Sequence, residues 1–226
     1  MAKKTSRDGL TVNVKTAKGR KGSSTKWLRR QLNDPFVDEA RKHGYRSRAV
    51  YKLTEIDDKY HFLKPGSIIV DLGCAPGSWC QVAVERTKGK ATIIGLDLQE
   101  VEPIEGVEFL VGDFMEEEIL LLLEEKLEGK KVDVVMSDMA AASCGHSQTD
   151  HIRIMALCEV AADFAFDWLR EGGAFVAKVL RGGTEQELLK SLRYHFTHVK
   201  HIKPKASRQD SSEIFVVATG FRARED

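Results

Sequence analysis

The chain has 226 residues, of which 42% are hydrophobic and 31% charged, and this suits one globular domain of ordinary size. No apolar run approaches the roughly 18 residues of a membrane-spanning helix, and the first ten residues lack the apolar segment of a secretory signal, so we expect a soluble, cytoplasmic protein without a membrane partner. The four cysteines, Cys74, Cys80, Cys144 and Cys158, show no CxxC spacing, which argues against a zinc site or a disulfide framework.

The net charge of +1 hides an uneven distribution along the chain. Residues 1–64 carry 17 Lys and Arg against 7 Asp and Glu, whereas residues 65–226 carry 18 against 27. Within residues 1–30, ten basic residues and one acidic residue are separated by Gly, Ser and Thr, which predicts a flexible basic arm ahead of one domain at residues 31–226. Nucleic acid is the natural partner of such an arm; a solubilising tail and an organellar transit peptide are the alternatives.

From Lys64 onward, short apolar runs alternate with longer amphipathic ones, which is the pattern of a doubly wound α/β sheet. Helices are predicted between the strands, including one that begins with a Ser78/Gln81 capping box and one over residues 150–173 that ends in glycine. Strands are predicted at residues 67–72, 92–97, 107–111, 132–137, 174–179, 197–202 and 213–219.

The last connection between strands is different from the others. Only about ten residues, 203–212, most of them polar, separate the last two predicted strands, too few for a crossover helix, so the final strand is expected to run antiparallel. Its first residue, Glu213, then lies at the edge where the parallel strands end and where ligands bind. The fold class is therefore α/β: a Rossmann-like, seven-stranded, mostly parallel sheet with an antiparallel last strand and helices on both faces.

The segment VDLGCAPGSWCQVA, residues 70–83, joins a buried strand to a helix through a Gly-rich turn. Ala75 stands where a dinucleotide-binding loop has its middle glycine, Pro76 lacks an N–H, and no GxxxxGK[ST] motif is present, so a phosphate cradle is disfavoured. A cofactor without phosphates fits better, and S-adenosylmethionine is the common one for this topology.

Candidate cofactor contacts follow from the positions of the strand ends. They are the Gly-rich turn that begins at Gly73, Asp97 for ribose hydroxyls, and Asp113 with Phe114 for an adenine, by hydrogen bond and stacking. Each carboxylate also has a structural alternative, Asp97 as a helix cap and Asp113 as a turn former.

Four ionisable residues are predicted to meet at the same edge of the sheet. Lys178 lies in an apolar strand, where an ammonium without partners is costly; Asp138 ends the strand before it. Lys52 borders the apolar face of its helix, and Glu213 begins the last strand. The alternatives are an edge strand whose Lys178 reaches water, a lysine at the core boundary for Lys52, and a helix cap for Asp138.

Five segments of the chain carry a resemblance to a known family: SRAVYKL, VDLGCAPGSW, MSDMA, VAKV and SSEIFVVATG. Together they resemble the FtsJ/RrmJ (RlmE) group of S-adenosylmethionine-dependent ribose 2′-O-methyltransferases, and the resemblance runs over about residues 27–220. The chain departs from this group at Ala141, where proline is common, and at Ser78, where glycine is common. The resemblance implies catalytic roles for Lys52, Asp138, Lys178 and Glu213. It implies cofactor contacts for Gly77, Trp79, Asp97, Asp113 and Asp138.

The resemblance also implies the substrate. The expected reaction is methyl transfer to a uridine ribose in the A-loop of 23S rRNA, with the large ribosomal subunit as partner, and we expect a monomer. The alternatives are a 2′-O-methyltransferase for tRNA or another RNA, or a non-catalytic RNA-binding or ribosome-assembly protein on the same fold. The spacing of three between His195, His198 and His201 alternates faces on a strand, so they cannot converge and no metal site is expected.

Overall fold

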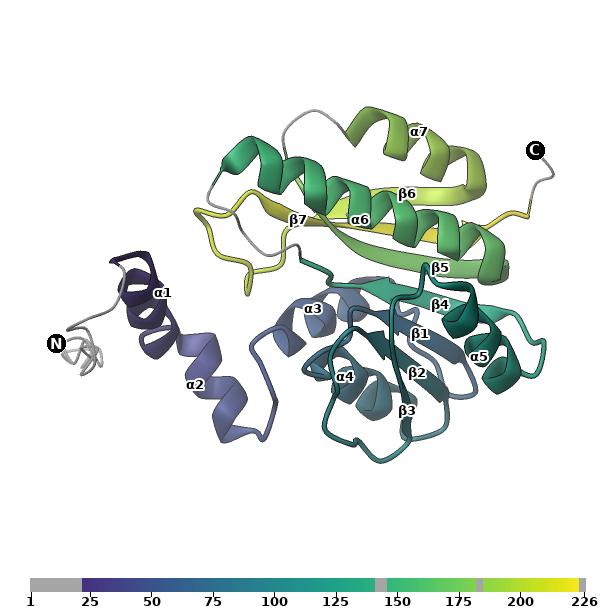
Figure 1. Cartoon of the computed structure of the whole chain (residues 1–226), viewed down its shortest axis with the longest axis horizontal. Coiled ribbons are helices and arrows are strands. Elements are labelled where there is room, and N and C mark those ends of the chain that lie inside the picture. The colour runs from purple at the N-terminus through teal and green to yellow at the C-terminus, as the bar shows by residue number, and fades with distance from the viewer. Residues whose placement is uncertain (1–21, 141–145, 182–184, 224–226) are drawn as a thin grey trace, which may run out of the picture. The chain divides into compact units, whose positions relative to one another are not determined.

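The computed structural model describes residues 22–140, 146–181 and 185–223, in two compact units that divide between Arg48 and Ala49 (Figure 1). The first unit contains α1 (Gly22–Leu32) and α2 (Pro35–Lys42). Asp34 caps α2 by accepting a hydrogen bond from the backbone N–H of Phe36 at 3.1 Å, and its carboxylate forms an ion pair with Arg48. Because residues 1–21 lie outside the described part, the limits of the basic arm remain a prediction.

Within the described residues of the second unit, seven strands form one sheet in the order β3-β2-β1-β4-β5-β7-β6. Strand β7 pairs antiparallel with β5 and β6, and the other neighbouring strands pair parallel. The predicted fold class is thereby confirmed, including the antiparallel last strand. The strands are β1 (Ile68–Leu72), β2 (Thr92–Asp97), β3 (Val107–Val111), β4 (Val132–Ser137), β5 (Leu169–Leu180), β6 (Phe196–Ile202) and β7 (Glu213–Phe221).

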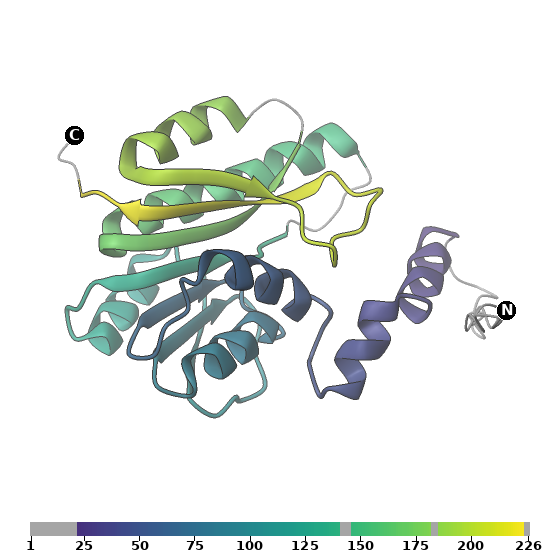
Figure 2. The ribbon, with the colours of Figure 1, turned by 180° about the vertical axis from the view of Figure 1, so that it is seen from behind.

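Helices cover both faces of this sheet (Figures 1 and 2). On one face lie α5 (Glu117–Leu127), α6 (Ser147–Trp168) and α7 (Glu185–His195), whose buried apolar residues form one core with inward residues of the strands. On the other face lie α3 (Val50–Tyr60) and α4 (Ser78–Thr87). The helix α3 buries Leu53 and Ile56 there, and this packing fixes the helix that carries Lys52.

Two local predictions at element ends were wrong. The N-cap of α4 is Gly77, with φ +94°, so Ser78 is the first helical residue and does not start a capping box. The helix α6 ends at Trp168, and β5 begins at Leu169, which pairs with Val132. The register of this pair shifts before Ala174, so the glycines there form an irregularity inside a strand instead of ending a helix.

In the parts of the chain that the structure describes, no helix has both the length and the apolar character that crossing a membrane requires.

Candidate active site

The carboxyl ends of the parallel strands and the start of β7 meet at one edge of the sheet. Glu213 pairs in register with Leu180 near the end of β5, as expected for an antiparallel last strand. Asp138 follows directly after β4, and Asp97 ends β2. This edge therefore receives polar side chains from segments that are far apart in sequence.

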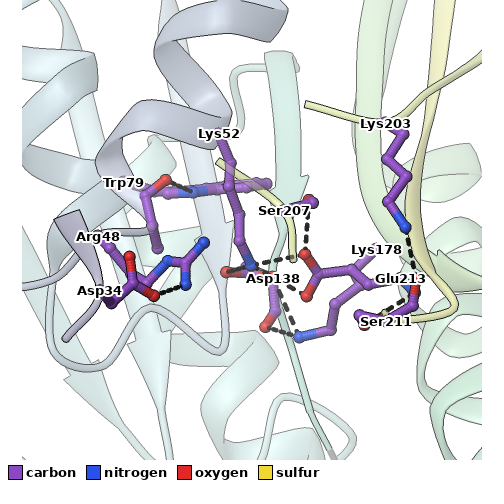
Figure 3. Close-up of polar contacts among 11 residues, drawn as sticks. Asp34, Arg48, Lys52, Trp79, Asp138, Lys178, Lys203, Ser207, Ser211 and Glu213 are labelled. Atoms are coloured by element: carbon purple, nitrogen blue, oxygen red, sulfur yellow. Dashed lines mark hydrogen bonds and ion pairs between the residues drawn. The ribbon is translucent and has the colours of Figure 1, made fainter. Parts of the chain in front are cut away.

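The four ionisable residues predicted from the sequence converge at this edge (Figure 3). Lys178 Nζ donates to Asp138 Oδ1 at 3.1 Å and to the main-chain oxygen of Asp138 at 2.7 Å. Lys52 Nζ lies 3.0 Å from each carboxylate oxygen of Glu213 and 3.6 Å from Asp138 Oδ2. The carboxylate of Asp138 thus lies between the two ammonium groups, and we call these four residues the tetrad.

All four side chains of the tetrad are largely removed from solvent. Lys178 is 8% exposed, Lys52 12%, Glu213 17% and Asp138 19%. Charged groups at this depth are stable only when they are paired, and here each ammonium has a carboxylate within hydrogen-bond distance. Because β5 lies between β4 and β7, the edge-strand alternative for Lys178 is wrong.

A cavity of about 350 Å³ opens beside the tetrad and shares Asp138 with it. Five residues predicted to contact a cofactor line this cavity: Gly73, Asp97, Asp113, Phe114 and Asp138. Sequence reasoning missed its apolar lining, which includes Leu96, Leu98, Met115, Met139 and Leu157. The apolar lining carries no motif, since its residues come from β2, from the segments that follow β2, β3 and β4, and from α6. The volume falls in the range of small-ligand sites.

Gly77 and Trp79, two further predicted cofactor contacts, are not among the residues that line the cavity. Gly77 caps α4, and Trp79 is 3% exposed. The indole Nε1 of Trp79 donates to the main-chain oxygen of Ala49 at 3.0 Å, and its ring lies 5.7 Å from that of Phe215. In this structure, Trp79 therefore ties the start of α3 to α4.

The backbone amides of the Gly-rich turn are used inside the protein. Gly73 N and Cys74 N donate to Leu96 O, at 2.8 and 3.1 Å, and Gly77 N donates to Cys74 O at 2.6 Å. Ala75 N donates to Asp97 Oδ2 at 2.9 Å, and Pro76 has no N–H. A phosphate-binding loop needs free amides, so this turn is not built as a pyrophosphate cradle.

The carboxylates of Asp97 and Asp113, which line the cavity, also accept hydrogen bonds from backbone amides of nearby loops. Asp97 accepts from Ala75 N through Oδ2 and from Gln99 N through Oδ1, each at 2.9 Å. Asp113 Oδ1 accepts from Met115 N at 3.0 Å. A carboxylate oxygen can accept more than one hydrogen bond, so the structural roles leave acceptor capacity for a ligand in the cavity.

A buried carboxyl that the sequence did not single out lies beneath this site. Asp71 in β1 is 1% exposed, and the thiol of Cys80 donates to its Oδ2 at 3.2 Å. Burial raises the pKa of Asp71 to about 8; the Cys80 hydrogen bond opposes the rise, and the charges of Asp138 and Asp97 add to it. The same environment raises the pKa of the Cys80 thiol, chiefly through its hydrogen bond with Cys74 and through burial.

Among the described side chains, no group of three or more His, Cys, Asp or Glu residues could hold a metal ion. His195 is the last residue of α7, whereas His198 and His201 lie in β6. Ala141, at the position where the resemblance expects proline, lies outside the described residues.

Three features together define the class of Rossmann-like methyltransferases. They are a doubly wound sheet with an antiparallel β7, a cavity at the ends of β1 to β4, and a Gly-rich turn whose amides donate within the protein. The chain belongs to the FtsJ-like methyltransferase family, whose model matches residues 45–221.

Individual relatives agree with this assignment. A protein of Jannaschia sp. (strain CCS1) called ribosomal RNA large subunit methyltransferase E is 60% identical, and the match covers all of both chains. A crystal structure from Plasmodium falciparum, described as a putative ribosomal RNA methyltransferase, is 38% identical with a TM-score of 0.73, and the match covers 80% of this chain and 100% of that one. The fold is also shared by a crystal structure of an S-adenosylmethionine-dependent O-methyltransferase from Thermotoga maritima. It is 18% identical with a TM-score of 0.52, and the match covers 79% of this chain and 67% of that one.

Proposed function

We propose that this chain is an S-adenosylmethionine-dependent methyltransferase that modifies the ribose 2′-hydroxyl of a uridine in the A-loop of 23S rRNA. The observation that carries the proposal is the tetrad, with Lys178 Nζ bound to Asp138 beside a cavity that Asp138 also lines. The large ribosomal subunit as the substrate is supported by the name of the Jannaschia relative. The uridine and the A-loop rest on the resemblance to the FtsJ/RrmJ group.

The residues around the cavity fit S-adenosylmethionine. Asp97 and Asp113 offer carboxylate oxygens to ribose hydroxyls and to an adenine amino group, and Phe114 offers an aromatic ring to the base. Gly73 has φ +71°, and a Cβ there would lie 2.3 Å from Met139 Cγ, so glycine lets the turn after β1 pack closely against the segment after β4, and both segments line the cavity. The bound cofactor supplies an electrophilic methyl group on a sulfonium, and Asp138 is the residue shared between its cavity and the tetrad.

Lys178 is the residue that either accepts the proton of the attacking hydroxyl or stabilises the oxyanion that forms. Its two hydrogen bonds to Asp138 occupy two of the three positions on Nζ. As a neutral amine it has a lone pair left to accept the proton, and as an ammonium it has an N–H left to stabilise the forming oxyanion. Both forms are compatible with its contacts to Asp138, which orient Nζ in either case.

The other members of the tetrad position the two lysines. Asp138 holds Lys178 directly and lies 3.6 Å from Lys52, while Glu213 holds Lys52 at 3.0 Å. The low exposure of all four groups excludes most water, so the positions of the charges are fixed before the substrate arrives. We assign Lys52 a second role in contacting the RNA near the reacting ribose.

The setting follows from the substrate. We propose that the protein acts in the cytoplasm as a monomer, and that its basic residues 1–30 contact phosphates of ribosomal RNA. Such contacts favour a bulky ribonucleoprotein as the substrate over a small RNA.

The test is to incubate the protein with labelled S-adenosylmethionine and large subunits that lack the modification, and then to map 2′-O-methylation. Naked 23S rRNA and tRNA are assayed beside the subunits. We expect one methylated A-loop uridine in the subunits. Methylation of tRNA in place of the subunits would support the alternative RNA substrate, and cofactor binding without transfer to any of the RNAs would support a non-catalytic protein.

A further inference from the structure

The loop between β6 and β7, residues 203–212, presents a serine to the tetrad (Figure 3). Ser207 Oγ donates to Glu213 Oε1 at 2.8 Å, while Lys52 Nζ lies 3.0 Å from both Oε1 and Oε2 of the same carboxylate. The ammonium thus contacts the two oxygens equally, and the hydroxyl contacts only one of them. Ser207 is therefore the group that fixes the rotation of the carboxylate about its last bond.

Ser207 itself has little freedom to move. It is 4% exposed, and its neighbour Ala206 is 1% exposed. The backbone N–H of Ser207 donates to Pro204 O at 2.9 Å, which closes a turn immediately before it. A serine on an exposed loop would follow a moving carboxylate, whereas this one holds the carboxylate in place.

The same loop is tied to the helix that carries Lys52. Lys205 N donates to Glu55 Oε2 at 2.7 Å, and Glu55 lies three residues after Lys52 in α3. Inside the loop, Lys203 Nζ donates to Ser211 O at 2.5 Å. The loop therefore connects α3 with the first residue of β7 and holds both members of the ion pair between them.

We propose that Ser207 is a positioning residue for methyl transfer, which orients Glu213 and, through Glu213, the ammonium of Lys52. The inference rests on the proposed function. Ser207 contacts no reacting atom; it acts through the carboxylate. Without the hydroxyl, the carboxylate rotates and Lys52 loses its fixed position beside Asp138, so the charge distribution around Lys178 is no longer set before reaction.

The experiment compares Ser207→Ala with Ser212→Ala, a serine of the same loop whose side chain is exposed. Both variants and the unmodified protein are assayed with undermethylated large subunits, and kcat, KM, the cofactor Kd and the thermal midpoint are measured. Ser207→Ala is expected to lower kcat about tenfold, the usual size of one hydrogen bond to a charged group, with KM and the cofactor Kd within about twofold. Ser212→Ala is expected to match the unmodified protein.

A double-mutant cycle separates positioning from a general structural effect. In a Glu213→Ala background, measured by single-turnover transfer of labelled methyl, Ser207→Ala is expected to cost nothing further, because the group on which it acts is gone. The same fractional loss in both backgrounds would overturn the proposal. If Ser207→Ala does not fold, Ser207→Cys takes its place, because a thiol has nearly the same shape as the hydroxyl but is a weaker hydrogen-bond donor. Ser207→Cys is expected to lower kcat severalfold, and an unchanged kcat would also overturn the proposal.

The two proposals fail in different ways. If the unmodified protein transfers no methyl group to the subunits, the proposed function is wrong. If it does and Ser207→Ala keeps the kcat of Ser212→Ala, the proposed function stands and the role of Ser207 is wrong.

Discussion

Lys178 donates from Nζ to both the carboxylate and the main-chain oxygen of Asp138, at 3.1 and 2.7 Å. The main-chain contact matters because it depends on the backbone at the end of β4 and not on the rotamer of Asp138 alone. It fixes Nζ relative to the loop that forms one wall of the cavity. The amine is thus positioned by the same segment that is proposed to hold the cofactor.

Replacing Lys178 with alanine is expected to abolish methyl transfer. The change removes the amine that is proposed to accept the proton of the ribose hydroxyl or to stabilise the forming oxyanion, and general acid–base groups typically contribute two to four orders of magnitude in rate. Cofactor affinity, measured by titration calorimetry, is expected to stay within about fivefold, because Lys178 does not line the cavity. Near-normal turnover would remove Lys178 from the mechanism.

Lys178→Arg distinguishes the two proton roles. An arginine can still orient the hydroxyl and stabilise an oxyanion, but it cannot accept the proton at accessible pH. A rate that stays very low at every pH identifies Lys178 as the base, whereas substantial activity identifies it as an electrostatic group.

The sequence was sufficient to predict where the tetrad meets, because strand ends follow from local patterns. Each of the four residues stands at a strand end or on the apolar border of a helix, and the ten-residue connection before Glu213 determined the direction of β7. These are short-range signals, and topology rules convert them into spatial proximity.

What the sequence did not reveal depends on contacts between distant segments. The bond of Trp79 to Ala49, the support of Glu213 by Ser207 and the burial of Asp71 each require side-chain positions that no periodicity encodes. The N-cap at Gly77 was missed because Ser78 has the better capping side chain, but the backbone conformation decides the cap.

Trp79→Phe is expected to destabilise the packing of α3 without lowering the affinity for the cofactor. The phenyl ring keeps the packing against Phe215 but loses the indole bond to Ala49 O, so the free energy of unfolding is expected to fall by about 1 kcal/mol. We also expect a lower kcat, since α3 carries Lys52. Chemical denaturation and a cofactor titration are the measurements, with Trp168→Phe in α6 as the matched control. A raised cofactor Kd with unchanged stability would instead show that Trp79 contacts the cofactor.

Neutralising the basic arm is expected to weaken binding of the ribosomal substrate selectively. Residues 1–21 hold seven Lys and Arg, and replacing all seven with glutamine preserves the length of the arm. Because phosphate contacts by cations release counterions, KM for large subunits is expected to rise at least about tenfold at moderate salt, and its salt dependence is expected to flatten. The values of kcat and of the cofactor Kd are expected to stay the same. An unchanged KM would identify the arm as a solubilising tail.

Asp71→Asn is expected to change how stability depends on pH. The pKa of Asp71 is raised to about 8 in the folded protein, against about 3.9 for an unfolded aspartate. Between these values the folded state binds one proton more than the unfolded state, so this group makes the protein less stable as pH rises, by up to about 1.4 kcal/mol per pH unit. An asparagine does not titrate, so the free energy of unfolding of the variant, minus that of the unmodified protein, should increase from pH 5 to pH 8.

Denaturant titrations at pH 5, 6, 7 and 8 measure this difference, with the exposed Glu187→Gln in α7 as the control. The substitution also has a fixed cost from the altered contact with the Cys80 thiol, but that cost is the same at every pH and leaves the slope unaffected. Stability differences that stay constant across the four pH values would mean that Asp71 is already ionised in the folded protein. A rising difference would mean that a neutral carboxyl lies beneath the site, which keeps one negative charge away from Asp138 and Asp97.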